Sequence, residues 1–135
     1  MNLSFYKTCF KITAIGNIIG AVAAIASMST NLELFYGANE SSTLLRFYHY
    51  NLWFFVLMLG IGYWFLGKEP IRNRILALIG ACGKAFIAAS WIHLLISNHA
   101  KPLILVAILY DGFFAVVMAL FFWQSRNEKL NTNSE

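Results

Sequence analysis

Four apolar runs, each about as long as a membrane is thick, constrain the fold of this chain more than any other feature. A helix needs ~20 mostly apolar residues to cross the hydrocarbon of a bilayer. Such runs extend over residues 12–28, 48–66, 75–96 and 102–122. Turn-forming or charged residues separate them, among them Pro70, which cannot continue a helix. The sequence therefore predicts an all-α integral membrane protein, a bundle of four transmembrane helices.

The composition favours the same class. Hydrophobic residues make up 59% of the 135 residues and charged residues only 12%, whereas about a quarter of a soluble domain is charged. So few charges exclude a soluble nucleic-acid-binding domain, and the expected surroundings are the lipid bilayer and other membrane protein subunits or further copies of the chain. Residues 1–126 are predicted to form a single domain, and the polar residues 127–135 a disordered cytoplasmic tail.

The basic residues predict the orientation, because positive charge in short loops favours the cytoplasmic side of a membrane. One side of the predicted bundle holds seven of them, namely Lys7, Lys11, Lys68, Arg72, Arg74, Arg126 and Lys129. The other side holds only Arg46 and Lys101. Both termini are therefore predicted to be cytoplasmic, and we expect the chain in a bacterial inner (plasma) membrane.

The N-terminal run has a second interpretation as a signal peptide. Lys7 and Lys11 precede an apolar stretch that ends in Ala24-Ile25-Ala26, which is similar to a cleavage site. Cleavage after residue 26 would leave three spans with the same orientation.

Small residues favour a retained first helix. Gly16, Gly20 and Ala24 are spaced four apart, which lets transmembrane helices approach closely. Gly60 and Gly62 in the second span and Gly80 in the third are further predicted packing positions.

The connections between the spans differ in length. The longest, residues 29–47, is predicted to face the outside and contains Asn39-Glu40-Ser41, an acceptor pattern for N-glycosylation. The other connections are short and predict antiparallel neighbours. Cys9 and Cys82 are too far apart in the predicted topology to form a disulfide, and no C-x-x-C motif supports redox chemistry.

Two ionisable residues inside the spans, Lys84 and Asp111, are the first candidates for function, because charges at membrane depth usually face a bundle interior or a cavity. Their α-carbons differ in depth by roughly 6 Å, which a lysine side chain can bridge, so a direct ion pair is one prediction. Helical side chains lean toward their own N-terminus, however, and these two lean apart. In the alternative, Lys84 meets Asn17 while Asp111 meets a group from the outer side, such as His93, His49 or Asn51. A third interpretation is that Lys84 extends to the membrane surface.

The histidines allow a haem site in principle. His49 and His93 are predicted to share the outer leaflet, where two imidazoles could hold haem. Their spacing is not diagnostic, so the sequence predicts neither a cofactor nor a metal site. His93 lies nine residues from Lys84, on the opposite face of the third span.

Three functions remain compatible with the sequence. Small packing residues and few polar groups favour an accessory or interaction protein, as a subunit of a larger membrane complex. The second hypothesis is a small oligomeric transporter or proton-linked permease that uses Lys84 and Asp111. Small multidrug exporters are similar in size and predicted topology, but they need an acidic residue in the first span, where this chain has Asn17. The third hypothesis is a membrane enzyme or a haem- or quinone-binding subunit.

Overall fold

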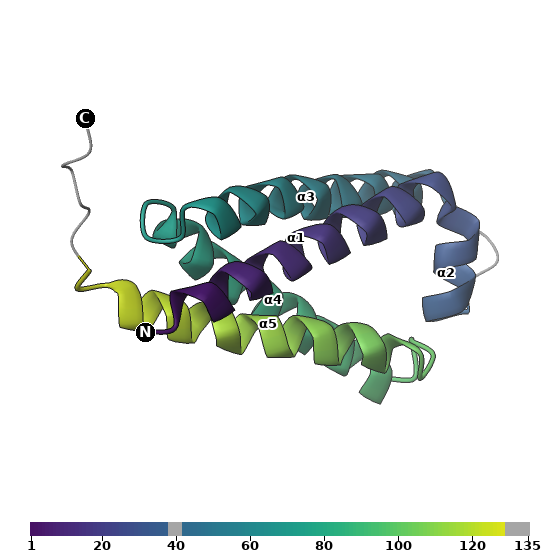
Figure 1. The fold of residues 1–135 in the computed structure, drawn as a ribbon. Helices are drawn as coiled ribbons and strands as arrows, with labels where there is room; N and C mark the ends of the chain where they lie inside the picture. Colours follow the sequence, from purple (N-terminus) through teal and green to yellow (C-terminus); the bar gives the residue numbers. More distant parts are fainter. Residues whose placement is uncertain (38–41, 129–135) are drawn as a thin grey trace.

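The computed structural model describes residues 1–37 and 42–128, and these residues form five helices and no strand. The four long helices are α1 (Leu3–Ala26), α3 (Thr43–Lys68), α4 (Arg74–Ile96) and α5 (Ile104–Ser125), and the short α2 (Met28–Tyr36) follows α1 (Figure 1). Each long helix is long and apolar enough to cross a membrane. The predicted all-helical fold with four candidate spans is confirmed. The predicted glycosylation acceptor at residues 39–41 and residues 129–135 of the predicted tail, with Lys129, lie outside the described residues.

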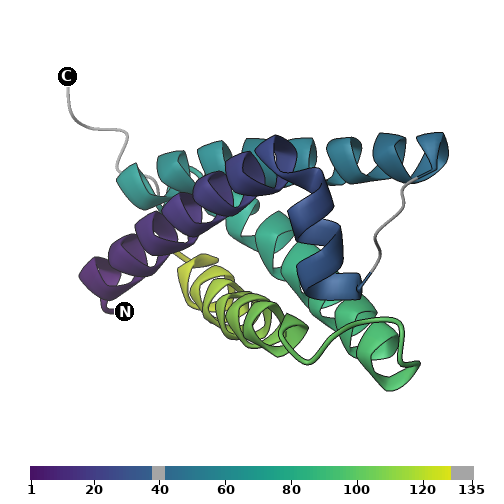
Figure 2. The ribbon, with the colours of Figure 1, turned by 90° about the vertical axis from the view of Figure 1, so that its right-hand side faces the viewer.

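The long helices form two antiparallel pairs. α1 packs along α3 and α4 packs along α5, and each pair is joined far more closely within itself than to the other pair. The α4–α5 pair runs at an angle to the α1–α3 pair (Figure 2). The N-terminus, the turn between α3 and α4 and the end of α5 lie at one end of the molecule, and α2 lies at the other (Figure 1).

Aromatic rings join the two pairs near the N-terminal end of α1. Phe10 and Phe121 are fully buried, with ring centroids 5.0 Å apart in an edge-on arrangement. Tyr6 packs on both rings, and its hydroxyl donates a hydrogen bond to Gln124. At the same end, the Arg74 guanidinium donates to backbone carbonyls at and just beyond the end of α5, among them that of Ser125 at 3.0 Å. This end of the molecule is therefore fixed by both packing and hydrogen bonds.

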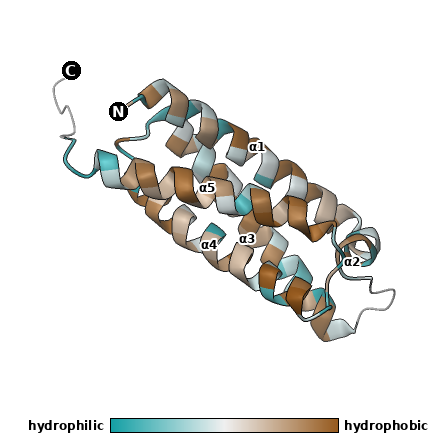
Figure 3. Ribbon diagram, turned by 90° about the horizontal axis from the view of Figure 1, so that it is seen from below, coloured by the Kyte–Doolittle hydropathy of each residue, from teal (hydrophilic) through white to brown (hydrophobic). Residues whose placement is uncertain are grey.

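The outside of the bundle has the polarity expected of a lipid-facing surface. Hydrophobic residues dominate the length of the long helices, and hydrophilic residues gather toward the helix ends and the turns (Figure 3). Many large apolar side chains are more than half exposed, including Ile19, Phe55, Phe86 and Leu109.

The structure corrects the prediction that residues 29–47 are a connection between helices. Met28–Tyr36 is a helix, α2, which ends at Gly37 in the left-handed conformation that favours glycine. α3 begins at Thr43, where the Ser42 side chain accepts a hydrogen bond from the Leu45 amide. Polar residues in α2 obscured its helical pattern. Its Leu32 is buried, and its Phe35 carbonyl accepts a hydrogen bond from the Lys101 amide.

Two other helices begin at different residues from the predicted spans. The first helix begins at Leu3 and not near residue 12, because Asn2 caps it and exposed Lys11 fits within the helix. The fourth begins at Ile104, two residues beyond the predicted start at Pro102.

Candidate functional site: a buried ion pair

A buried ion pair links α4 to α5. The Nζ atom of Lys84 donates a hydrogen bond to Oδ1 of Asp111 at 2.5 Å, and the two residues are only 5% and 8% exposed. The same ammonium group also donates to Oδ1 of Asn17 on α1, at 3.2 Å. The direct Lys84–Asp111 pair and the Lys84–Asn17 contact were predicted from the sequence as alternatives, and the structure contains both. Lys84 does not extend to the end of its helix.

Lys84 and Asp111 can pair although their side chains lean in opposite directions, because the two side chains differ in length. Lysine carries its charge on a flexible four-carbon stem, whereas the aspartate carboxyl lies close to its helix backbone. Lys84 can therefore turn toward Asp111 even though both residues project toward their own N-termini. Either charge alone would be costly to bury, and the mutual attraction of the pair offsets part of that penalty.

Two tyrosines enclose the ammonium group. Nζ of Lys84 lies 4.7 Å from the ring centroid of Tyr110 and 5.9 Å from that of Tyr63, which are distances of cation–π contacts. The Tyr110 hydroxyl donates to the backbone carbonyl of Thr13 on α1, at 3.1 Å. Through Asn17, Tyr63, Lys84 and Asp111, all four long helices contribute side chains to this polar cluster.

Glycines make room for the two tyrosine rings. A Cβ atom on Gly16 would clash with the Tyr110 hydroxyl, and one on Gly80 would lie 2.5 Å from Sδ of Met118 and 2.8 Å from the Tyr63 hydroxyl. Tyr63 is 1% exposed, and its hydroxyl has no hydrogen-bond partner among the described residues. The cluster therefore contains one polar group that the described part of the chain leaves unsatisfied.

The other predicted packing residues lie at helix contacts of different closeness. Gly60 faces α1, where an added Cβ would lie 3.2 Å from the Ala14 carbonyl oxygen. Added Cβ atoms on Gly20 and Gly62 would make ordinary contacts with Trp53, at 4.0 Å, and Leu76, at 3.9 Å. Ala24 is buried.

The structure does not bring the predicted histidines together. His49 is buried on α3, and its Nε2 lies 2.9 Å from the Ala24 carbonyl oxygen. His93 is exposed on α4. In the described part of the chain, no group of three or more His, Cys, Asp or Glu residues is arranged to hold a metal ion.

α4 is less buried than α1 and α5. Only 28% of the apolar window of α4 is buried, compared with 39% for α1 and 44% for α5. The face of α4 with Gly80, Lys84 and Ala88 is buried, but Cys82 and Phe86 on another face are exposed.

Tyr63, Tyr110 and Thr13 are members of the cluster that the sequence did not identify. Tyr63 was hidden among the aromatic residues of the second span, most of which face outward. Two signals were available, since Tyr110 precedes Asp111 directly and Thr13 lies one helical turn before Asn17.

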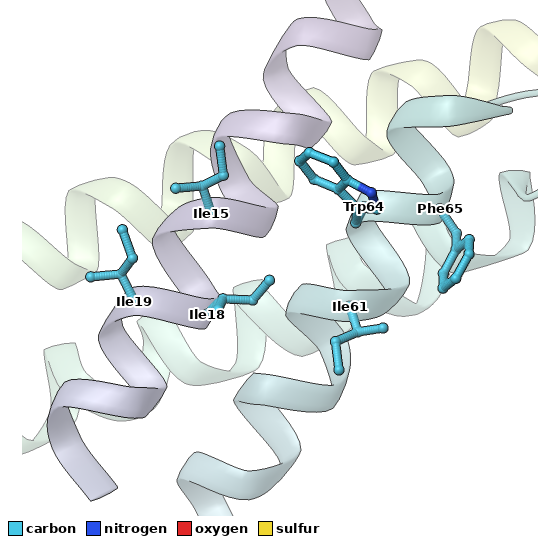
Figure 4. A pocket seen from close by; sticks show the side chains of 6 residues that line it. All are labelled: Ile15, Ile18, Ile19, Ile61, Trp64 and Phe65. Carbon is cyan, nitrogen blue, oxygen red and sulfur yellow. The ribbon is translucent and has the colours of Figure 1, made fainter. Parts of the chain in front are cut away.

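A separate apolar groove lies on the outside of the α1–α3 pair. It has a volume of about 390 Å³ and is lined by Ile15, Ile18, Ile19, Ile61, Trp64 and Phe65. Trp64 and Ile18 point into the space between the two helices, and the other side chains flank it (Figure 4).

The chain matches no protein family model, and no curated protein or solved structure was found to be similar to it.

Proposed function

We propose that this chain is an integral membrane protein with four spanning helices and cytoplasmic termini, and that it serves as a small accessory subunit of a larger membrane complex. The bacterial inner membrane is the proposed location. The length and apolar character of the four long helices support insertion. The excess of basic residues at the end that holds the N-terminus and the end of α5 supports the orientation.

One observation carries the accessory role, namely that the charged pair inside the bundle, and Asn17 and Tyr110 beside it, bond to groups of the same chain. Lys84 is held by Asp111 and Asn17, and Tyr110 by Thr13. The Lys84–Asn17 and Tyr110–Thr13 hydrogen bonds connect the α1–α3 pair to the α4–α5 pair, and the two pairs are joined less closely than the helices within each pair. Polar groups that hold a bundle together are typical of a structural or interaction protein.

Photocrosslinking in native membranes tests this role. A photoreactive amino acid replaces Phe55 on α3 or, in a matched variant, Phe86 on α4, both of which are strongly exposed. We expect one partner protein, in constant ratio to the chain, to be crosslinked from one of these faces, and tagging that partner to recover the chain. A chain recovered only as a monomer or as a homodimer contradicts the accessory role.

A second candidate function is a small oligomeric transporter or proton-linked permease in which Lys84 and Asp111 line the path. The unpartnered Tyr63 hydroxyl, on a ring that contacts the Lys84 ammonium, favours this candidate. Proton flux into proteoliposomes would distinguish the two functions. Flux that is present in the wild type and lost in a folded Asp111→Asn variant supports transport, and an absence of flux in the wild type contradicts proton-linked transport.

A further inference from the structure

Two lysines lie at one end of the apolar groove between α1 and α3. Lys11 is one turn before Ile15 on α1, and Lys68 is one turn after Trp64 on α3. Residues three or four apart share a helix face, so each lysine continues the row of groove-lining residues on its own helix. Because the two helices are antiparallel, both lysines lie at the same end of the groove. Both are exposed.

The two helices approach closely at this end. A Cβ atom on Gly67 would lie 2.9 Å from Cγ of Lys11 and 3.4 Å from the Lys7 carbonyl oxygen. The stem of Lys11 therefore lies against the backbone next to Lys68. The nearby carboxylate of Glu69 is engaged by Arg72, at 3.2 Å.

The charge at this end is strongly positive. The described residues include six basic side chains here, Lys7, Lys11, Lys68, Arg72, Arg74 and Arg126, and two acidic ones, Glu69 and Glu128. The groove itself is lined only by apolar and aromatic residues. A binding site for a soluble small molecule normally includes polar groups that fix its orientation, so this groove is suited to hydrocarbon and its basic end to an anion.

We propose that the α1–α3 groove binds an anionic phospholipid, with an acyl chain along the groove and the phosphate group at Lys11 and Lys68. This inference rests on the proposed insertion into a membrane. Basic pockets between transmembrane helices on the cytoplasmic side bind anionic headgroups. The apolar lining suits an acyl chain and the basic end suits a phosphate group, so an anionic phospholipid matches both parts of the groove.

Lipid binding is measured by native mass spectrometry and titration in mixed micelles, with phosphatidylglycerol as the anionic probe and phosphatidylcholine as the neutral one. We expect the wild type to prefer phosphatidylglycerol, and the preference to weaken with salt. Each lysine near the surface contributes about 1 kcal/mol, so the Lys11→Gln/Lys68→Gln variant should bind phosphatidylglycerol ~30-fold more weakly. Lys101→Gln, at the opposite end of the molecule, is the matched control and should leave binding unchanged.

A second variant tests the acyl-chain position. Ile15→Trp places a large side chain in the groove, and Val116→Trp places one on the exposed face of α5 as the control. We expect only Ile15→Trp to reduce phosphatidylglycerol binding. Equal binding of both lipids by the wild type, or unchanged binding after loss of both lysines, overturns the proposal. An Ile15→Trp variant that alters oligomeric mass but not lipid binding also overturns it, because the groove is then a protein interface.

Failure of this proposal is distinguishable from failure of the proposed function. If alkaline carbonate releases the chain from membranes, insertion itself is wrong. If the chain stays inserted and crosslinks to its partner without any preference for phosphatidylglycerol, only the lipid site is wrong.

Discussion

Removal of one member of the Lys84–Asp111 pair should destabilise the protein far more than removal of both. Both residues are more than nine-tenths buried, so Lys84→Met leaves an aspartate in the bundle without its cation. Removing one partner of a buried pair costs about 3–5 kcal/mol, whereas replacing both with apolar residues of similar size is often neutral or stabilising. We therefore expect losses of ~3–5 kcal/mol for Lys84→Met and for Asp111→Leu, and a loss below ~1 kcal/mol for the double variant.

Reversible unfolding in mixed micelles measures the four free energies of this double-mutant cycle. The matched control is the exposed Arg72–Glu69 pair, whose side chains are 75% and 57% exposed. Neutralising Arg72 and Glu69 should give a coupling energy below ~1 kcal/mol. If the effects of Lys84→Met and Asp111→Leu simply add, with a coupling energy as small as that of the exposed pair, the mutual stabilisation inferred from the geometry is refuted.

Three further predictions concern single side chains. Gly80→Ala should destabilise the protein by ~1–3 kcal/mol through its clash with Tyr63 and Met118, whereas Gly83→Ala, with open space around it, should not; equal effects in thermal unfolding would contradict the packing argument. Tyr110→Phe should lower the free energy of unfolding by about 1 kcal/mol, because the Tyr110 hydroxyl donates a hydrogen bond to the Thr13 carbonyl. Tyr63→Phe should be neutral or stabilising, because the Tyr63 hydroxyl has no partner among the described residues. A larger loss for Tyr63→Phe in the same assay would show that its hydroxyl has a partner. Burial raises the pKa of Tyr36 above its ordinary value of 10.0, and a hydrogen bond with Trp91 opposes the shift. The buried neutral tyrosine therefore stabilises the fold below pH 10, and this contribution is lost as the pH rises through the raised pKa. Tyr36→Phe should accordingly lose less stability than the wild type in an alkaline titration, and equal losses would contradict the burial of this hydroxyl.

The four long helices could be predicted from the sequence because the requirement for a long apolar run is strict. The short α2 could not, since Asn31 and Glu33 interrupt its apolar pattern and its position depends on contacts with distant residues. One such contact is the hydrogen bond from the Lys101 amide to the Phe35 carbonyl. Local composition carries no information on such a partner.

The members of the polar cluster were only partly predictable. Lys84 and Asp111 are identified by their charge at membrane depth, and Asn17 by its amide. Tyr63 belongs to a span with many aromatic residues, and nothing in the sequence of that span distinguishes it from them. Its burial depends on the absence of a side chain at Gly80 of another helix. Such a pairing is a property of the packed bundle, and the periodicity of one helix does not reveal it.

Cysteine labelling tests most directly whether the chain has four spanning helices and cytoplasmic termini. Single cysteines replace Asn73, in the turn after α3, or His99, in the turn after α4, in a background where Cys9 and Cys82 are alanine. A membrane-impermeant maleimide is then applied to intact cells. If both termini are cytoplasmic, the cysteine at residue 99 should be labelled at once and the cysteine at residue 73 only after permeabilisation. Labelling of both sites from the same side, or in the reverse pattern, would contradict a four-span protein with cytoplasmic termini.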